Sequence, residues 1–192
     1  MAYGSYGETA RNGFDWLTRR DAEMLVAMRR WRAPRRIPWL DRVMIALTRA
    51  GNPSSWFVHG LLLFSVAEIA GTESRQLLLL LAAAALVATA VAQVLKRVCQ
   101  RPRPDVGIHG FEAIVENPDV FSFPSGHSTV AFAVATALAS ADLRIGSAEL
   151  ALAAAIAASR VYLGAHYPLD VVVGALLGIV CGMGVALGLA AN

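Results

Sequence analysis

Three short polar stretches interrupt this apolar chain, and their side chains are suited to binding phosphate. Lys96, Arg103 and Arg160 supply fixed positive charges, and arginine forks together with a lysine charge suit a dianion with several oxygens. The stretch PSGH at 124–127 is typical of a helix start, because proline fits the first turn, where its missing N–H costs nothing. Ser125, Gly126 and His127 are then expected to supply free N–H groups that bind an anion, and Gly126 lets a ligand approach the backbone closely. The predicted phosphate-binding residues are Lys96, Arg103, Ser125, Gly126 and Arg160.

Two histidines and an aspartate add groups that can transfer a phosphoryl group. His166 and Asp170 lie four positions apart around a proline at an expected helix start. Asp170 can hold one ring nitrogen of His166 and leave the other nitrogen free to attack phosphorus. His127 can protonate the leaving oxygen as a general acid. Because the cations can stabilise the transferring phosphoryl group, we expect no metal ion or other cofactor.

Each stretch also has a plainer interpretation when it is taken alone. The basic residues from Lys96 to Arg103 are typical of a juxtamembrane cluster that extends toward lipid headgroups. PSGH is then only a helix-opening turn, and His166 with Asp170 is a capping pair. The catalytic interpretation therefore depends on whether the fold brings all three stretches to one place.

The composition places these stretches in a membrane protein. Of the 192 residues, 56% are hydrophobic and 16% are charged, with a mean hydropathy of +0.52, whereas a soluble domain carries about 25% charged residues. The chain has apolar runs of roughly the length of a membrane helix and lacks the period-two alternation of a barrel strand. The sequence therefore predicts an all-α, polytopic membrane bundle of about five transmembrane helices. The apolar runs are Ser55–Ala70, Leu77–Leu95, Ser128–Ala141, Ala148–Leu163 and Leu169–Ala191.

The order of these runs brings the polar stretches to one membrane face. The basic stretch follows the second run, PSGH opens the third, Arg160 closes the fourth and His166 precedes the fifth. Because successive spans alternate in direction, these positions all lie on the same side, which favours a single site. The connector 96–123 is long, and a long ordered connector tends to be functional. Its residues His109, Glu112, Glu116 and Asp119 are expected in a solvated loop, with a role in gating or tuning substrate entry as the alternative.

The last apolar run contains glycine pairs at the spacing of close helix packing. These pairs are Gly174 with Gly178 and Gly184 with Gly188. We expect both pairs to face a neighbouring helix.

The first 53 residues form an arginine-rich segment, so we divide the chain into 1–53 and a transmembrane core at 54–192. The segment holds ten arginines against five acidic residues. Apolar residues recur at helical spacing from Phe14 to Trp31, and a second amphipathic stretch covers Pro38–Ala50. These stretches are expected to lie in the membrane interface, with a helix packed on the rest of the protein as the alternative. No nucleic-acid motif accompanies the arginines, so the expected partner is the bilayer and not nucleic acid.

The three polar stretches together resemble the motifs of the type 2 phosphatidic acid phosphatase superfamily, which includes the vanadium haloperoxidases. The matching residues are Lys96 with Arg103 and Pro104, then Pro124–His127, then Ser159 and Arg160 with His166 and Asp170. The resemblance implies an all-helical core and, for phosphatase members, no metal cofactor. It also implies a phosphohistidine on His166, an orienting role for Asp170 and an acid role for His127. The five predicted phosphate-binding residues named above would then bind the phosphate.

The resemblance and the apolar composition predict an integral membrane hydrolase that acts on a lipid phosphate or diphosphate, either polyprenyl-linked or a glycerophospholipid. A lipid-linked phosphotransferase with the same histidine is the alternative, and a non-catalytic lipid-binding or transport protein is a third candidate. Membrane members commonly have six spans, whereas about five are expected here. With five spans, the arginine-rich segment lies on the face of the site, so the positive-inside rule predicts a cytoplasm-facing site in the inner membrane. The sequence predicts no oligomeric state.

Overall fold

Helices make up the regular secondary structure of this protein. The computed structural model describes residues 15–32, 37–69, 74–116 and 119–191. Within these ranges there are eight helices and no strand, and one isolated β-bridge joins Pro102 to Phe121. The helices are α1 (Asp15–Arg32), α2 (Pro38–Ala50), α3 (Pro53–Ile69), α4 (Ser74–Cys99), α5 (Pro104–Gly107), α6 (Gly126–Ala141), α7 (Leu143–Tyr162) and α8 (Pro168–Ala190).

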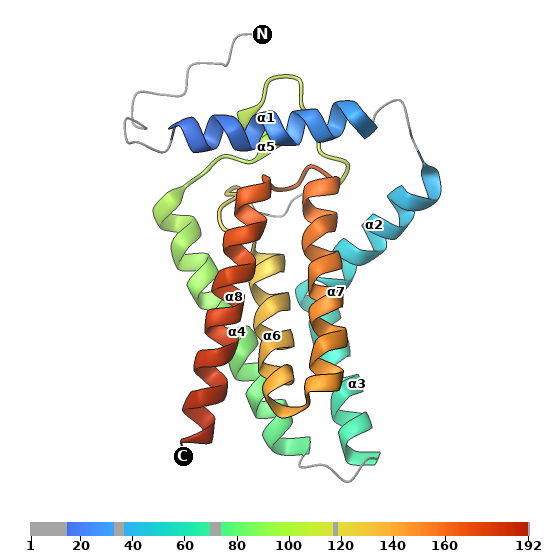
Figure 1. The fold of residues 1–192 in the computed structure, drawn as a ribbon, viewed down its shortest axis with the longest axis vertical. Coiled ribbons are helices and arrows are strands. Elements are labelled where there is room, and N and C mark those ends of the chain that lie inside the picture. Colours follow the sequence, from blue (N-terminus) through green and yellow to red (C-terminus); the bar gives the residue numbers. More distant parts are fainter. Residues whose placement is uncertain (1–14, 33–36, 70–73, 117–118, 192) are drawn as a thin grey trace.

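Three of the described helices are long and apolar enough to cross a membrane. They are Arg75–Cys99 in α4, Leu143–Tyr162 in α7 and Pro168–Ala190 in α8, and α6 is a shorter apolar helix. Figure 1 shows α6, α7 and α8 running side by side, with the C-terminus at the end of the bundle opposite α1. The predicted class, an all-α membrane bundle, is therefore confirmed, while the count of five spans stays a prediction.

α6 is the central helix of the bundle, and it packs against α4, α7 and α8. On the α8 side, a Cβ added at Gly178 would lie 2.4 Å from the carbonyl oxygen of Thr129. A Cβ added at Gly182 would lie 2.4 Å from the carbonyl oxygen of Ala133. Since Cβ atoms do not approach oxygens so closely, only glycine lets these two helix backbones touch.

The two predicted glycine pairs have different surroundings. Gly174 and Gly178 both face α6, as expected, and a Cβ at Gly174 would lie 2.8 Å from the carbonyl oxygen of Ser125. A Cβ at Gly184 or Gly188 would meet nothing within 4 Å, so the prediction was wrong for that pair. Spacing shows that two glycines share a helix face, but it does not show that a neighbouring helix covers that face.

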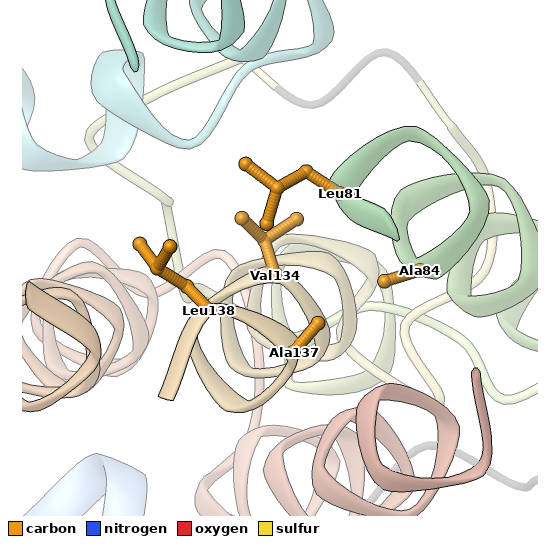
Figure 2. Close-up of a cluster of buried hydrophobic side chains, with 5 residues drawn as sticks. All are labelled: Leu81, Ala84, Val134, Ala137 and Leu138. Carbon is orange, nitrogen blue, oxygen red and sulfur yellow. The ribbon is translucent and has the colours of Figure 1, made fainter. Parts of the chain in front are cut away.

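Ordinary apolar side chains join α6 to α4. Figure 2 shows Leu81 and Ala84 of α4 beside Val134, Ala137 and Leu138 of α6, and all five side chains are buried. A cavity of about 380 Å³ remains between α3, α4 and α6, and its walls are apolar. Its lining includes Trp56, His59, Phe64, Leu78, Leu81 and Val134.

α1 lies across one end of the bundle, next to the start of α8 (Figure 1). Its side chains Ala22 and Leu25 are buried in a cluster with Phe111 and Tyr167. Met24 on the same helix is 56% exposed. One side of α1 therefore packs on the protein, as the alternative interpretation expects, while another side presents apolar atoms that suit a membrane interface.

Candidate active site

The predicted site residues meet at the end of the bundle that α1 covers. They come from the end of α4 and the segment after it, the start of α6, the end of α7 and the start of α8: Lys96 and Arg103, Ser125–His127, Arg160, and His166 with Asp170. Two contacts show how close these segments are. Nη1 of Arg103 lies 3.4 Å from Nε2 of His166, and the N–H of Ser125 donates to the backbone carbonyl of Asp170 at 3.0 Å.

His166 and Asp170 form a buried pair at the start of α8. Their side chains are 1% and 0% exposed, and Nδ1 of His166 lies 3.5 Å from Oδ2 of Asp170. The same Oδ2 accepts a hydrogen bond from the backbone N–H of Tyr167 at 3.0 Å. Asp170 therefore caps its helix, as the plainer interpretation expects, and also faces the histidine ring. Catalytic hydrogen bonds are often long before substrate binds.

The ring of His166 is held in its neutral form. Burial lowers the pKa of His166 well below its ordinary value, and the positive charges of Arg103, Arg160 and Lys96 lower it further. A backbone hydrogen bond with Ser122 acts on this pKa in the opposite direction. A neutral imidazole keeps a lone pair on one nitrogen. With Nδ1 facing a carboxylate, that nitrogen is Nε2, on the side of Arg103.

Lys96 and Arg103 share one carboxylate, that of Asp119. Nζ of Lys96 donates to Oδ2 of Asp119 at 2.6 Å, and Nη2 of Arg103 pairs with Oδ1. Arg103 also donates to the backbone carbonyls of Asp119 and Ala165, each at 2.8 Å. Burial lowers the pKa of Arg103 to about 10, so its guanidinium stays charged at neutral pH. Asp119, expected in a solvated loop, instead lies between two of the predicted phosphate-binding cations.

The start of α6 differs in two details from the sequence-based expectation. The helix begins at Gly126 with Ser125 as its N-cap, so Pro124 precedes the cap and is not in the first turn. The N–H of Ser125 is occupied by the carbonyl of Asp170. The N–H groups left to bind an anion are those of Gly126 and His127, in the first turn, where a helix offers no carbonyl partner. The prediction that Ser125 offers a free N–H was wrong, because its amide links α6 to α8.

His127 points to the corner between α2 and α3. Its Nε2 lies 3.0 Å from Oδ1 of Asn52, and an amide oxygen accepts hydrogen bonds, which favours a proton on Nε2. A Cβ added at Gly51 would lie 2.8 Å from Cδ2 of His127. Arg160 reaches the same region, since its Nη1 donates to Oγ1 of Thr48 in α2. The α2–α3 corner is therefore part of the site wall.

Sequence analysis missed several polar partners at this site. They are Asp21, Thr48, Asn52, Arg101 and Asp119. Asp21, Thr48 and Asn52 had no signal of their own, because their partners are distant in the chain; Asn52, for example, is 75 positions from His127. Asp119 had only its place in the long connector, from which a role in substrate entry was the alternative expectation. Arg101 did carry a signal, since it is an arginine between two predicted ligands. Among the described residues, no group of three or more His, Cys, Asp or Glu side chains could hold a metal ion.

The part of the chain that holds the predicted site residues is similar to known proteins. A family model described as the PAP2 superfamily matches residues 77–191. The decaprenylphosphoryl-5-phosphoribose phosphatase of Mycobacterium tuberculosis is 38% identical over 128 residues, which make up 64% of this chain and 67% of that protein. Every predicted site residue lies within 77–191, whereas α1 to α3 lie before it.

Two solved structures share the fold. The crystal structure of Aquifex aeolicus LpxE has a TM-score of 0.69 and 30% identity, and the match covers 85% of this chain and 92% of that one. The transmembrane PAP2 type phosphatidylglycerolphosphate phosphatase from Bacillus subtilis also has a TM-score of 0.69, with 27% identity over 89% of this chain and 85% of that one. The helical arrangement is therefore that of known membrane proteins.

Proposed function

Because the chain belongs to the PAP2 superfamily, we propose that it removes phosphate from a lipid phosphate or diphosphate through a phosphohistidine on His166. The observation that carries this proposal is the placement of the buried His166 ring. Its Nδ1 faces Asp170 at 3.5 Å, and its Nε2 faces the guanidinium of Arg103 at 3.4 Å. The nitrogen with the free lone pair is thus beside a group that binds phosphate oxygens.

The reaction proceeds in two steps. In the first, Nε2 of His166 attacks phosphorus and the bond from phosphorus to the leaving oxygen breaks. His127, in its imidazolium form, gives that oxygen the proton of Nδ1 and keeps the proton on Nε2 that faces Asn52. In the second, water attacks the phosphohistidine, His127 takes its proton, and inorganic phosphate leaves while His166 is restored. Lys96, Arg103 and Arg160 offset the charge on the transferring group in both steps.

Asp119 has to leave its position for this reaction to occur. Its carboxylate pairs with both Lys96 and Arg103, and a phosphate group needs the same donors. The side chain of Asp119 is 39% exposed, so it can turn toward solvent. Substrate binding is then an exchange of one anion for another on the same cations.

The apolar part of the substrate is proposed to lie against α3 and α4. The cavity of about 380 Å³ includes Trp56 in its lining, and Nε1 of Trp56 donates to the carbonyl of Gly51 at 3.1 Å. Gly51 precedes Asn52, the partner of His127. The cavity therefore adjoins the wall of the site, where a prenyl or acyl chain attached to the phosphate can enter from the bilayer. The names of the relatives, which include polyprenyl-linked and glycerophospholipid phosphates, fit this substrate class.

Phosphate release from a panel of lipids tests the proposal. The panel contains a polyprenyl diphosphate, a phosphorylated polyprenyl-phosphate sugar, phosphatidylglycerophosphate, phosphatidic acid and a soluble phosphomonoester. We expect release from at least one lipid, none from His166→Ala, and an acid-labile phosphoenzyme when the labelled reaction is quenched. Release that survives in His166→Ala would overturn the mechanism. Lipid binding without release, even when acceptor alcohols are added, would favour a non-catalytic role.

We also propose that the site faces the cytoplasm in the inner membrane. The support is the arginine-rich N-terminal segment, whose described helix α1 lies at the site end of the bundle (Figure 1). A Ser5→Cys variant that lacks Cys99 and Cys181 tests this orientation, although Ser5 lies outside the described residues. An impermeant maleimide should leave the introduced cysteine unlabelled in intact cells and should label it after lysis. Labelling in intact cells would place the segment outside.

A further inference from the structure

A buried chain of charges connects α1 with the start of α8. Nη2 of Arg101 pairs with Oδ2 of Asp21 at 2.8 Å, and Nη1 of Arg101 pairs with Oδ1 of Asp170 at 2.5 Å. The side chains of Arg101, Asp21 and Asp170 are 12%, 5% and 0% exposed. One guanidinium therefore joins a carboxylate of the amphipathic helix to the carboxylate that faces His166.

The second oxygen of Asp21 contacts the backbone beside Asp170. Oδ1 of Asp21 accepts a hydrogen bond from the N–H of Leu169 at 2.9 Å. Leu169 is in the first turn of α8, where N–H groups have no partner within the helix and a negative charge is stabilised. Asp21 thus holds Arg101 with one oxygen and the first turn of α8 with the other.

Arg101 is one of three groups that hold the carboxylate of Asp170, together with the N–H of Tyr167 and the side chain of Ser122. Its guanidinium lies 4.0 Å from the centre of the Tyr167 ring, a cation–π contact. It binds Oδ1 of Asp170, while Oδ2 accepts from the N–H of Tyr167 and faces His166. Burial opposes the charge of Arg101, but the two carboxylates raise its pKa above the ordinary value. Without Asp21, Arg101 would be a buried cation with Asp170 as its remaining acidic partner, and it would draw that carboxylate away from His166.

We infer that Asp21 is a positioning residue of the active site, acting through Arg101 on Asp170. This inference rests on the proposed roles of His166 and Asp170. If Asp21 has this role, the site is complete only when α1 is packed on the bundle. Residues 77–191, which the family model matches, do not include Asp21, so the α1 helix adds a contact to the site from outside the matched region.

The test compares two substitutions on α1 that each remove one negative charge. Asp21→Asn removes the charge beside Arg101. Glu23→Gln is the matched control, because Glu23 is half exposed and, among the described residues, pairs only with Arg20, at 3.6 Å, one helical turn away. We expect Asp21→Asn to lower kcat about tenfold, the effect of removing an outer partner of an oriented group, with KM changed less than twofold. Glu23→Gln should leave both constants unchanged.

A double-mutant cycle separates positioning from a general effect on folding. If Asp21 acts through Asp170, then Asp21→Asn should lower kcat about tenfold in the parent protein but not in an Asp170→Asn background. Equal losses in both backgrounds would overturn the inference, as would an unchanged kcat or a loss confined to KM. Thermal unfolding of each variant in detergent shows whether the compared proteins are equally folded.

A spectroscopic measurement keeps this inference independent of turnover. The ring nitrogen shifts of ¹⁵N-labelled histidine report which nitrogen carries the proton, and the His166 signals are assigned by their loss in His166→Gln. We expect a proton on Nδ1 in the parent protein and a partial shift to Nε2 in Asp21→Asn. An identical His166 spectrum in the two proteins would overturn the positioning role. If the parent hydrolyses no lipid, the proposed function fails while this comparison still decides the role of Asp21.

Discussion

The two sides of α6 are built differently. Toward α8, the backbones touch at Gly178 and Gly182, and the buried ion pairs of the site lie at the end of that contact. Toward α3 and α4, apolar side chains leave a cavity of about 380 Å³. A transferring phosphoryl group needs charges held in fixed positions, whereas a long apolar chain needs space. The helix that separates the two sides can therefore serve a rigid site and an adaptable one.

Matched losses of charge on the two sides should have unequal effects, and this is the largest difference we expect. Asp170→Asn keeps the shape of the side chain but removes the charge that orients His166, and we expect kcat to fall about 10³-fold or more. Glu149→Gln makes the same chemical change at the ion pair between His59 of α3 and Glu149 of α7, where Nε2 and Oε1 lie 3.0 Å apart. It should leave kcat within about twofold. Equal losses of kcat in the two variants would show that the charge of Asp170 contributes no more to catalysis than the charge of Glu149.

Replacing an arginine by lysine should distinguish a fork that binds phosphate from a charge at the membrane surface. Arg103→Lys keeps the charge but loses the planar set of donors, and we expect kcat/KM to fall about 10²-fold. Arg97→Lys, on the exposed side of α4, is the control and should have no effect. An active Arg103→Lys enzyme would mean that only the charge at this position matters.

Adding a methyl group to the close contact between α6 and α8 should destabilise the protein. Gly178→Ala places a Cβ 2.4 Å from the carbonyl oxygen of Thr129, and we expect the free energy of unfolding to fall by about 1–3 kcal/mol. Gly184→Ala places a Cβ in open space and should not destabilise the protein. Thermal unfolding in detergent measures both changes. A Gly178→Ala protein as stable as the parent would mean that the two backbones can separate without cost.

Removing the charge of Asp119 should have the smallest effect of these changes, and it should strengthen the binding of anions. The carboxylate pairs with Lys96 and Arg103, the cations proposed to bind phosphate. We therefore expect Asp119→Asn to lower the inhibition constants of phosphate and vanadate about threefold, the size of an exposed ion pair. Glu116→Gln, in the same loop and exposed, should change neither constant. Weaker inhibition in Asp119→Asn would instead show that Asp119 holds the two cations in place for the substrate.

The fold class and the meeting of the predicted residues could be read from the sequence because both depend on local features. Apolar runs of membrane length predict the helices, and Lys96, Ser125 and Arg160 lie at helix ends that the run boundaries already indicate. Helix ends that alternate between two faces then bring these residues together. No packing detail is needed for that step.

The remaining features depend on contacts that spacing cannot show. Arg101 joins Asp21 to Asp170 across 69 positions on one side, and nothing in the neighbouring residues of either carboxylate indicates this partner. Gly184 and Gly188 are four residues apart, as Gly174 and Gly178 are, but a Cβ at Gly184 would meet nothing within 4 Å. Which face of a helix is covered depends on where the other helices lie. The sequence therefore indicated which candidate site residues lie together but not which residues hold them in place.

The hydrogen bond between Leu169 and Asp21 spans 148 positions, and this has a consequence for biosynthesis. Chains are made and folded from the N-terminus onward, so α1 leaves the ribosome long before its acceptor exists. Until α8 has been inserted, Asp21 and Arg101 have no aspartate to orient, and the charges of α1 are free to associate with lipid headgroups. A growing chain therefore contains most of the predicted phosphate-binding cations before it contains the proposed nucleophile, so its predicted anion-binding groups come before the residue proposed to attack phosphorus.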